Sequence, residues 1–233
     1  MSTFAVIIPA AGQSRRFVGF DQKKPFVELL GVPIWLRTVD HFVNCESVVE
    51  IILVLAEEDR SEFETKFAAE IQTRNLTIVS GGASRAESVR NGMQAVQSQA
   101  EWLAVHDAAR PLLTSEGLNS LFTAALQHGS VIPGIPVTST VKRINSKQQI
   151  CETVDRESLR IAQTPQVFRR DVLWNAFESA SDLSSFTDEA SVVEATGSTV
   201  TVHPGWPENI KITTADDFRL AESWIKSQSP AAQ

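Results

Sequence analysis

The chain has 233 residues, of which 42% are hydrophobic and 21% charged, and its formal net charge is -7. This length and hydrophobic content are enough for one substantial core. An acidic chain is a poor candidate for binding long nucleic acid, because such binding depends on many Lys and Arg contacts to phosphate. No apolar run approaches the ~20 residues of a membrane span. Cys45 and Cys151 are too few for a disulfide framework, so we expect reduced thiols and a cytoplasmic protein with no membrane partner.

Short apolar runs alternate with helical patterns through the first part of the chain. Strands are predicted from Phe4, Val48, Leu76, Trp102 and Ser130, and helical patterns cover residues 33–44, 59–72, 84–96 and 115–129. Strands rich in Val and Ile that are separated by helices of this length indicate βαβ units. We therefore predict an α/β fold of Rossmann-like type, with a mostly parallel sheet that binds its ligand beyond the carboxyl ends of the strands.

The pattern changes between Thr138 and about residue 168, where polar and apolar residues alternate around the turn-like "NSKQQ". We predict a β-hairpin that protrudes as an arm, because its apolar content is too low for a core of its own. Helical patterns return at 169–180 and 187–197, followed by a strand at 198–205, a short strand "NIKIT" and a helix from Thr214, its predicted N-cap. No linker divides the chain, so residues 1–233 are predicted to form a single domain.

The segment after the first strand, "PAAGQSRR", combines small residues with cations. Backbone amides of such a turn can approach a ligand closely, and Arg15, Arg16, Lys23 and Lys24 could neutralise a polyphosphate. The spacing is neither that of a Walker P-loop nor that of the dinucleotide fingerprint. A tight turn followed by a solvated helix start explains the same residues, so this segment alone does not decide between the two interpretations.

Two further segments belong to the same predicted edge of the sheet. "SGGASRAES" supplies a second small-residue turn, in which Ser84 and Glu87 form a capping-box pattern that requires no function. "VHDAARP" places Asp107 at the end of a strand, where a carboxylate facing phosphates is a natural Mg²⁺ ligand. For His106 a catalytic base is conceivable, but a packed histidine is the favoured interpretation.

The segments "PAAGQSRRF", "GGASRAESV", "VHDAARP", "TVDRESL", "QTPQVF", "TDEAS" and "NIKIT" occur in this order. Together they closely resemble the 2-C-methyl-D-erythritol 4-phosphate cytidylyltransferases of the non-mevalonate isoprenoid pathway, from about Phe4 to Trp224. The resemblance implies transfer of CMP from CTP to the substrate phosphate, with release of pyrophosphate and a requirement for Mg²⁺. It also implies a homodimer formed through the β-arm.

The resemblance assigns roles to individual residues. Arg16 and Lys24 would stabilise charge at the α-phosphate, and Asp107 would bind Mg²⁺. Arg156 and Lys211 would position the methylerythritol phosphate, Arg156 by crossing into the site of the partner chain. The remaining substrate-binding residues would be Ala10, Ala11, Gly12, Gly82 and Ser88 around the cytidine, and Thr140, Arg110 and Thr164 around the second substrate.

Two positions depart from the family pattern. The family usually has Pro-Lys-Gln before an aromatic residue, where this chain has Lys23-Lys24-Pro25-Phe26, so the choice of Lys24 depends on aligning Phe26 with that aromatic. Position 83, often acidic in relatives, is Ala. A cytidylyltransferase for another polyol phosphate, such as ribitol 5-phosphate, is the alternative function. A catalytically silent nucleotide-binding protein is disfavoured because Arg16, Lys24, Asp107, Arg156 and Lys211 are all present.

Overall fold

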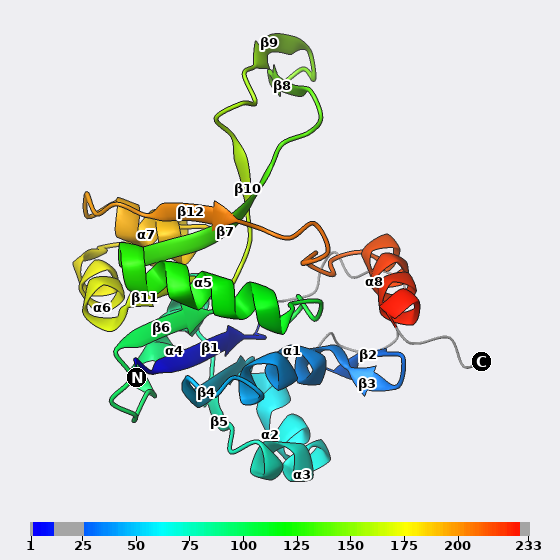
Figure 1. The fold of residues 1–233 in the computed structure, drawn as a ribbon, viewed down its shortest axis with the longest axis vertical. Helices are drawn as coiled ribbons and strands as arrows, with labels where there is room; N and C mark the ends of the chain where they lie inside the picture. Colours follow the sequence, from blue (N-terminus) through cyan, green and yellow to red (C-terminus); the bar gives the residue numbers. More distant parts are fainter. Residues whose placement is uncertain (1, 12–25, 229–233) are drawn as a thin grey trace.

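The computed structural model describes residues 2–11 and 26–228, and its centre is an eight-stranded sheet (Figure 1). The strand order is β10-β7-β11-β6-β1-β4-β5, with β12 alongside β7. The strands β1 (Phe4–Pro9), β4 (Val48–Leu55), β5 (Thr77–Ser80) and β6 (Trp102–Val105) are mutually parallel, as the alternating pattern predicts. Their carboxyl ends therefore share one edge of the sheet.

The other half of the sheet is mixed. β10 (Arg160–Ala162) and β11 (Gln166–Arg169) run antiparallel to β7 (Ser130–Pro136), whereas β12 (Thr201–Pro204) is parallel to it. β11 also pairs antiparallel with β6 and so joins the two halves. The parallel arrangement predicted from the first half of the chain therefore stops at β6.

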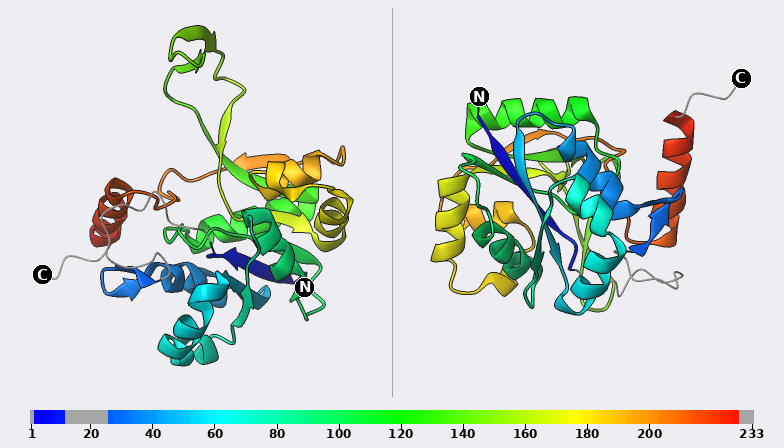
Figure 2. Two further views of the ribbon diagram at one scale, coloured as in Figure 1. Left: turned by 180° about the vertical axis from the view of Figure 1, so that it is seen from behind. Right: turned by 90° about the horizontal axis from the view of Figure 1, so that it is seen from below.

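Helices cover both faces of the sheet (Figure 2). Phe4, Val6 and Ile8 of β1 face α1 (Ile34–Val43), α2 (Glu57–Lys66) and α5 (Ser115–His128), while Ala5 and Ile7 face the opposite layer. This opposite layer contains α4 (Arg85–Gln94), α6 (Arg170–Ser179) and α7 (Glu189–Glu194). Alternate residues of a strand point to opposite faces, so one continuous apolar run supplies both cores.

One predicted helix is divided into two. The pattern over 59–72 forms α2 and then α3 (Ala68–Thr73), which are separated at Phe67. The Phe67 ring is buried against Phe63 and Trp35, with ring centroids 4.8 and 5.3 Å away. Its backbone has φ -114° and ψ 27° rather than helical values, so the chain leaves the first helix where it buries this ring.

The predicted arm is present but shorter than expected. β8 (Val141–Ile144) and β9 (Ile150–Val154) pair as an antiparallel hairpin that projects from the body (Figure 1). β10 and β11 belong to the central sheet, and Val167 and Phe168 of β11 are completely buried. The limit near residue 168 was therefore wrong, because the alternating pattern continues from the exposed hairpin into a core strand.

The C-terminal part packs α8 (Ala215–Gln228) beside the short hairpin of β2 (Glu28–Leu29) and β3 (Val32–Pro33). Thr214 caps this helix as predicted, since its hydroxyl accepts a hydrogen bond from the Asp217 N–H at 3.2 Å. "NIKIT", predicted as a short strand, is irregular. None of the helices in the described ranges combines the length and apolarity needed to cross a membrane.

Candidate active site

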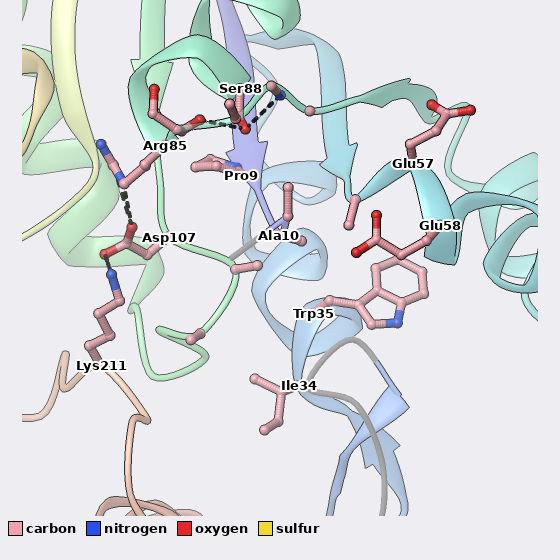
Figure 3. A pocket seen from close by; sticks show the side chains of 18 residues that line it. Pro9, Ala10, Ile34, Trp35, Glu57, Glu58, Arg85, Ser88, Asp107 and Lys211 are labelled. Atoms are coloured by element: carbon pink, nitrogen blue, oxygen red, sulfur yellow. Dashed lines mark hydrogen bonds and ion pairs between the residues drawn. The ribbon is translucent and has the colours of Figure 1, made fainter. Parts of the chain in front are cut away.

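A cavity of about 710 Å³ opens at the carboxyl ends of the parallel strands (Figure 3). Segments at four strand ends line it: Pro9–Ala11 at the end of β1, Ala56–Glu58 after β4, Gly81–Ser84 after β5, and Asp107–Ala109 after β6. Ile34, Trp35, Arg85, Ser88 and Lys211 complete the wall. The volume is in the range of small-molecule sites, and the position is the one at which open α/β sheets bind ligands.

Small residues line one wall of this cavity, so the backbone itself forms much of that wall. The Ser88 hydroxyl accepts a hydrogen bond from the Gly82 N–H at 3.1 Å and donates one to the Ser84 carbonyl at 2.9 Å. A side chain at Gly81 would come within 2.7 Å of both Ala11 Cβ and Ser88 Oγ, so a larger residue does not fit. The predicted capping box of Ser84 and Glu87 is also present, and it fixes the start of α4 behind the turn.

Asp107, at the base of the cavity, is surrounded by three cations. Its Oδ2 atom lies 3.0 Å from Lys211 Nζ and 3.2 Å from Arg110 Nε, and its Oδ1 atom lies 3.3 Å from Arg85 Nη2. Burial by itself raises the pKa of this carboxyl, but Arg85, Lys211 and Arg110 together hold the pKa well below its usual value. Asp107 is therefore ionised over the whole physiological range.

Sequence reasoning missed Arg85 and left Glu189 without a role. Arg85 is the first residue of α4, and its guanidinium bridges Asp107 and the Glu189 carboxylate, with Nη1 2.5 Å from Glu189 Oε1. Glu189 is only 1% exposed. A buried carboxylate requires a cationic partner. The available signals in the sequence were an acidic residue in a short amphipathic helix, Glu189, and an arginine beside a capping box, Arg85. Nothing in the sequence joined them, because they are 104 residues apart.

His106 is packed and neutral, as the favoured interpretation held. Its side chain is fully buried, and burial lowers its pKa to about 3. Nε2 lies 3.1 Å from the Arg110 carbonyl, which can only accept, so Nε2 carries the proton and Nδ1 accepts from the Thr164 hydroxyl at 3.0 Å. Thr164 Oγ1 in turn accepts from the Asp107 N–H at 3.1 Å. This chain of hydrogen bonds holds the Asp107 backbone in place.

The irregular segment "NIKIT" lies against the loop that follows β6. The Asn209 carbonyl accepts from Arg110 Nη1 at 2.7 Å, and the Ile212 N–H donates to the Ala109 carbonyl at 2.8 Å. Asn209 Nδ2 also donates to the Thr164 carbonyl at 2.8 Å. These contacts replace strand pairing and bring Lys211, which lies between the two anchoring residues, to Asp107.

A second, smaller cavity of about 230 Å³ adjoins this cluster. It shares Arg85, Asp107 and Lys211 with the first cavity. Arg110, Thr164 and the start of the α7 region line the rest of it, together with Ala162, Gln163, Gln166, Thr187 and Asp188. Arg85, Asp107 and Lys211 therefore lie between the two cavities and line both.

The structure brings most of the predicted site residues together. Those lining the larger cavity are Ala10, Ala11, Gly82, Ser88, Asp107 and Lys211, and those lining the smaller one include Arg110 and Thr164. Thr140 and Arg156 lie on the arm and border neither cavity. Gly12, Arg16, Lys24 and Pro25 lie outside the described residues. Ala83 lines the larger cavity, so position 83 offers no carboxylate to it.

Asp107 fits a single-carboxylate magnesium site better than a site built from protein ligands alone. In the described part of the chain, no three His, Cys, Asp or Glu side chains gather at one point. Mg²⁺ commonly takes one or two carboxylates and completes its shell with water and substrate phosphate. Asp107 is ionised and borders both cavities, which matches that pattern.

Comparison with known proteins decides the family. The sequence model of the 2-C-methyl-D-erythritol 4-phosphate cytidylyltransferase family (IspD) matches residues 4–227. The chain belongs to this family. A cytidylyltransferase of this name from Symbiobacterium thermophilum is 41% identical over 97% of this chain and 94% of its own length. The enzyme of the same name from Alkaliphilus metalliredigens is 35% identical over the whole chain and 97% of its own length.

Solved structures agree with the sequence comparison. The structure of 4-diphosphocytidyl-2C-methyl-D-erythritol synthase from Anaerococcus prevotii has a TM-score of 0.83 at 26% identity, covering 97% of this chain and 96% of that one. The enzyme from Francisella tularensis gives 0.80 at 28% identity, covering 96% and 99%. The predicted α/β fold, enzyme class and family are thus confirmed, and the family activity is CTP-dependent cytidylyl transfer in isoprenoid biosynthesis.

Proposed function

We propose that the larger cavity holds CTP, that the smaller one holds the phosphate end of 2-C-methyl-D-erythritol 4-phosphate, and that the two substrates meet at Asp107. The reaction is that of the family: a phosphate oxygen of the methylerythritol phosphate bonds to the α-phosphorus of CTP. The bond from that phosphorus to the β-phosphate oxygen breaks, and pyrophosphate leaves. The observation that carries the proposal is that Arg85, Asp107 and Lys211 border both cavities.

Charge neutralisation is the main requirement of this chemistry. The second pKa of a phosphate monoester is about 6, so the nucleophile is largely a dianion at neutral pH and needs no general base. The neutral, enclosed state of His106 agrees with this. Lys211 and Arg110 supply positive charge beside the smaller cavity. Arg16 and Lys24, outside the described residues, are proposed to stabilise the charge that develops at the α-phosphate.

Asp107 is the proposed protein ligand for Mg²⁺. When bound there, the ion would neutralise phosphate charge and help to orient the triphosphate. Lys211 and Arg110 both pair with Oδ2 of Asp107, at 3.0 and 3.2 Å. Oδ1 has the longer contacts of Arg85, at 3.3 and 3.4 Å, and is the oxygen proposed to meet the ion. Glu57 and Glu58 line the opposite side of the larger cavity and lie away from Asp107 (Figure 3).

The arm is proposed to complete the site of a second copy of the chain. Ile144 and Ile150 of the hairpin are 48% and 65% exposed, and an unpaired hairpin with such residues is a surface that another copy can cover. Arg156 and Thr140, carried on the same arm, would then reach the partner's methylerythritol phosphate.

The free thiols of Cys45 and Cys151 support the proposed cytoplasmic location, since disulfides are rare in that compartment.

Asp107→Asn tests the proposed junction between the two cavities. We expect kcat to fall on the order of 10²-fold and the Mg²⁺ concentration at half-maximal activity to rise, because the amide cannot supply the charge that attracts the ion. Pyrophosphate release from CTP and methylerythritol phosphate measures both quantities. Asp182→Asn, at the exposed N-cap of the short 3-10 helix Leu183–Ser185, is the matched control and should behave as wild type, because asparagine also caps well. An unchanged Mg²⁺ titration in Asp107→Asn would remove Asp107 from the site.

A further inference from the structure

Outside the residues assigned above, one ionic group reaches the reaction centre from a distant element. Glu189, in the first turn of α7, is 1% exposed and forms a two-point contact with Arg85: Nη1 to Oε1 at 2.5 Å and Nη2 to Oε2 at 3.1 Å. The same guanidinium touches Asp107 Oδ1 at longer distances, 3.3 and 3.4 Å. Glu189 is therefore the stronger of the two partners that hold Arg85.

The position of Glu189 is itself fixed by the sheet. Gln166 of β11 donates from Nε2 to Asp188 Oδ2 at 2.8 Å, and its Oε1 accepts from the Ala190 N–H at 2.8 Å. These two bonds fasten the residues on either side of Glu189 to a buried strand. Asp188 also caps α7 by accepting from the Ser191 N–H. The carboxylate that holds Arg85 is consequently attached to the rigid core and not to a loop.

From this geometry we propose that Glu189 is a positioning residue that acts through Arg85 on the Asp107 carboxylate. By drawing the guanidinium toward α7, Glu189 keeps Arg85 from forming a closer ion pair with Oδ1 of Asp107. That oxygen therefore remains available to a divalent cation. The inference rests on the proposed role of Asp107 and extends it, since Glu189 borders neither cavity.

Neutralising Glu189 changes the balance of charge without removing volume. In Glu189→Gln the amide holds Arg85 less strongly, and the partly exposed guanidinium moves toward Asp107. A cation that competes with Arg85 for Asp107 then binds less well. Replacing outer groups that orient a metal ligand commonly costs about 10- to 100-fold in metal affinity or activity.

The experiment compares Glu189→Gln with Glu194→Gln, which makes the same change at the exposed end of the same helix. Two quantities are measured: the Mg²⁺ concentration at half-maximal activity, and the Kd of Mn²⁺ in the presence of CTP, measured by electron paramagnetic resonance. We expect Glu189→Gln to raise both by about tenfold or more. Glu194→Gln should leave both unchanged, and Glu189→Asp, which keeps the charge, should restore most of the loss.

A positioning role predicts that the effects of Arg85→Gln and Glu189→Gln on Mn²⁺ binding are not additive. Arg85→Gln alone leaves the buried Glu189 carboxylate without a cation, which is strongly destabilising. Adding Glu189→Gln should therefore raise the thermal midpoint of unfolding above that of Arg85→Gln. The double variant should bind Mn²⁺ within about twofold of Arg85→Gln. If Glu189→Gln does not fold, Arg85→Lys tests the same link, because a lysine cannot bridge both carboxylates. A lysine that pairs with Glu189, the stronger partner, leaves Asp107 free, so the Kd of Mn²⁺ should not rise, and a tenfold rise would contradict the positioning role.

Three results would overturn the inference: Glu189→Gln that binds Mn²⁺ like Glu194→Gln, Glu189→Asp that is as impaired as Glu189→Gln, or additive effects in the double variant. The Asp107→Asn titration separates this failure from that of the proposed function. If Asp107→Asn is impaired while Glu189→Gln is not, only the positioning role is lost. If Asp107→Asn binds Mn²⁺ normally, Asp107 itself is not the ligand and both proposals fail.

Discussion

The cations around Asp107 and the cations of the arm differ in how the chain holds them. Arg85 is held by Glu189 and Arg110 by the Asn209 carbonyl, so both guanidinium groups are in place before any ligand arrives. On the arm, the Arg156 side chain donates to the Thr138 carbonyl of the same arm, and Thr140 is exposed. The cations around Asp107 are therefore held by buried partners within one chain, whereas Arg156 and Thr140 of the arm are proposed to act in the site of a second copy.

The largest expected effect tests whether the arm belongs to the partner's site. Arg156→Ala and Lys24→Ala should each lower kcat by roughly 10² or more, because each removes a cation from the charged reaction centre. When the two inactive variants are dissociated, mixed and reassociated, up to about a quarter of the sites should be intact if the arm crosses over. Pyrophosphate release measures the recovery.

Two controls make this mixing experiment decisive. Lys23→Ala should retain nearly full activity, and equal losses at Lys23 and Lys24 would contradict the assignment of the loop cation. Subunit exchange is followed independently with differently tagged copies. If exchange is complete and activity does not return, Arg156 serves its own chain, and the contrast between body and arm has no functional meaning.

A moderate effect is expected from the buried His106 of the body. Its pKa is about 3 in the folded protein and near 6.5 when unfolded, so the unfolded state binds the proton more tightly. The contribution to stability is complete above pH 6.5 and is lost as the pH falls toward 3, by up to about 1.4 kcal/mol per pH unit. His106→Gln should remove this slope between pH 6.5 and 5, where most carboxyl groups are still ionised.

Urea unfolding of both proteins at several pH values checks this prediction. The comparison uses the change in free energy of unfolding with pH and not its absolute value, because the substitution also alters packing. His41, whose pKa burial also lowers, contributes equally to both proteins. Parallel pH curves for wild type and His106→Gln would show that His106 is protonated in the folded state or is accessible to solvent.

The smallest effect is expected at an ion pair on the arm. Arg143 Nε lies 2.9 Å from Glu152 Oε2, but the two side chains are 65% and 55% exposed. Exposed pairs of this kind contribute about 0–1 kcal/mol, so Arg143→Ala should barely change the free energy of unfolding. Arg74→Ala, which breaks a less exposed pair with Asp40 in the body, should cost more. A larger loss at Arg143 would indicate that the proposed second copy also covers the side of the hairpin that carries this ion pair.

The sequence by itself predicted the strands β1, β4, β5, β6 and β7, the small-residue turns and the capping box of α4. Those features depend on neighbours within a few residues: apolar runs bury strands, and Ser84 reaches the Glu87 N–H of its own helix. The family motifs assigned Asp107 and Lys211 to one predicted site, and in the structure their side chains lie 3.0 Å apart. The break of the helix at Phe67 and the true end of the arm were beyond such local patterns, because burial against distant residues decided both.

Only the tertiary structure decided which charges meet. Arg85, Asp107 and Glu189 are far apart in the chain, and each alone is consistent with a solvated helix terminus or a strand end. The sheet brings α4, β6 and α7 to one edge, and burial there requires each carboxylate to find a cation. Likewise "NIKIT" satisfies its backbone groups against the loop after β6 instead of in a ladder, and this places Lys211. Long-range pairing, which no local period encodes, set the chemistry of the site.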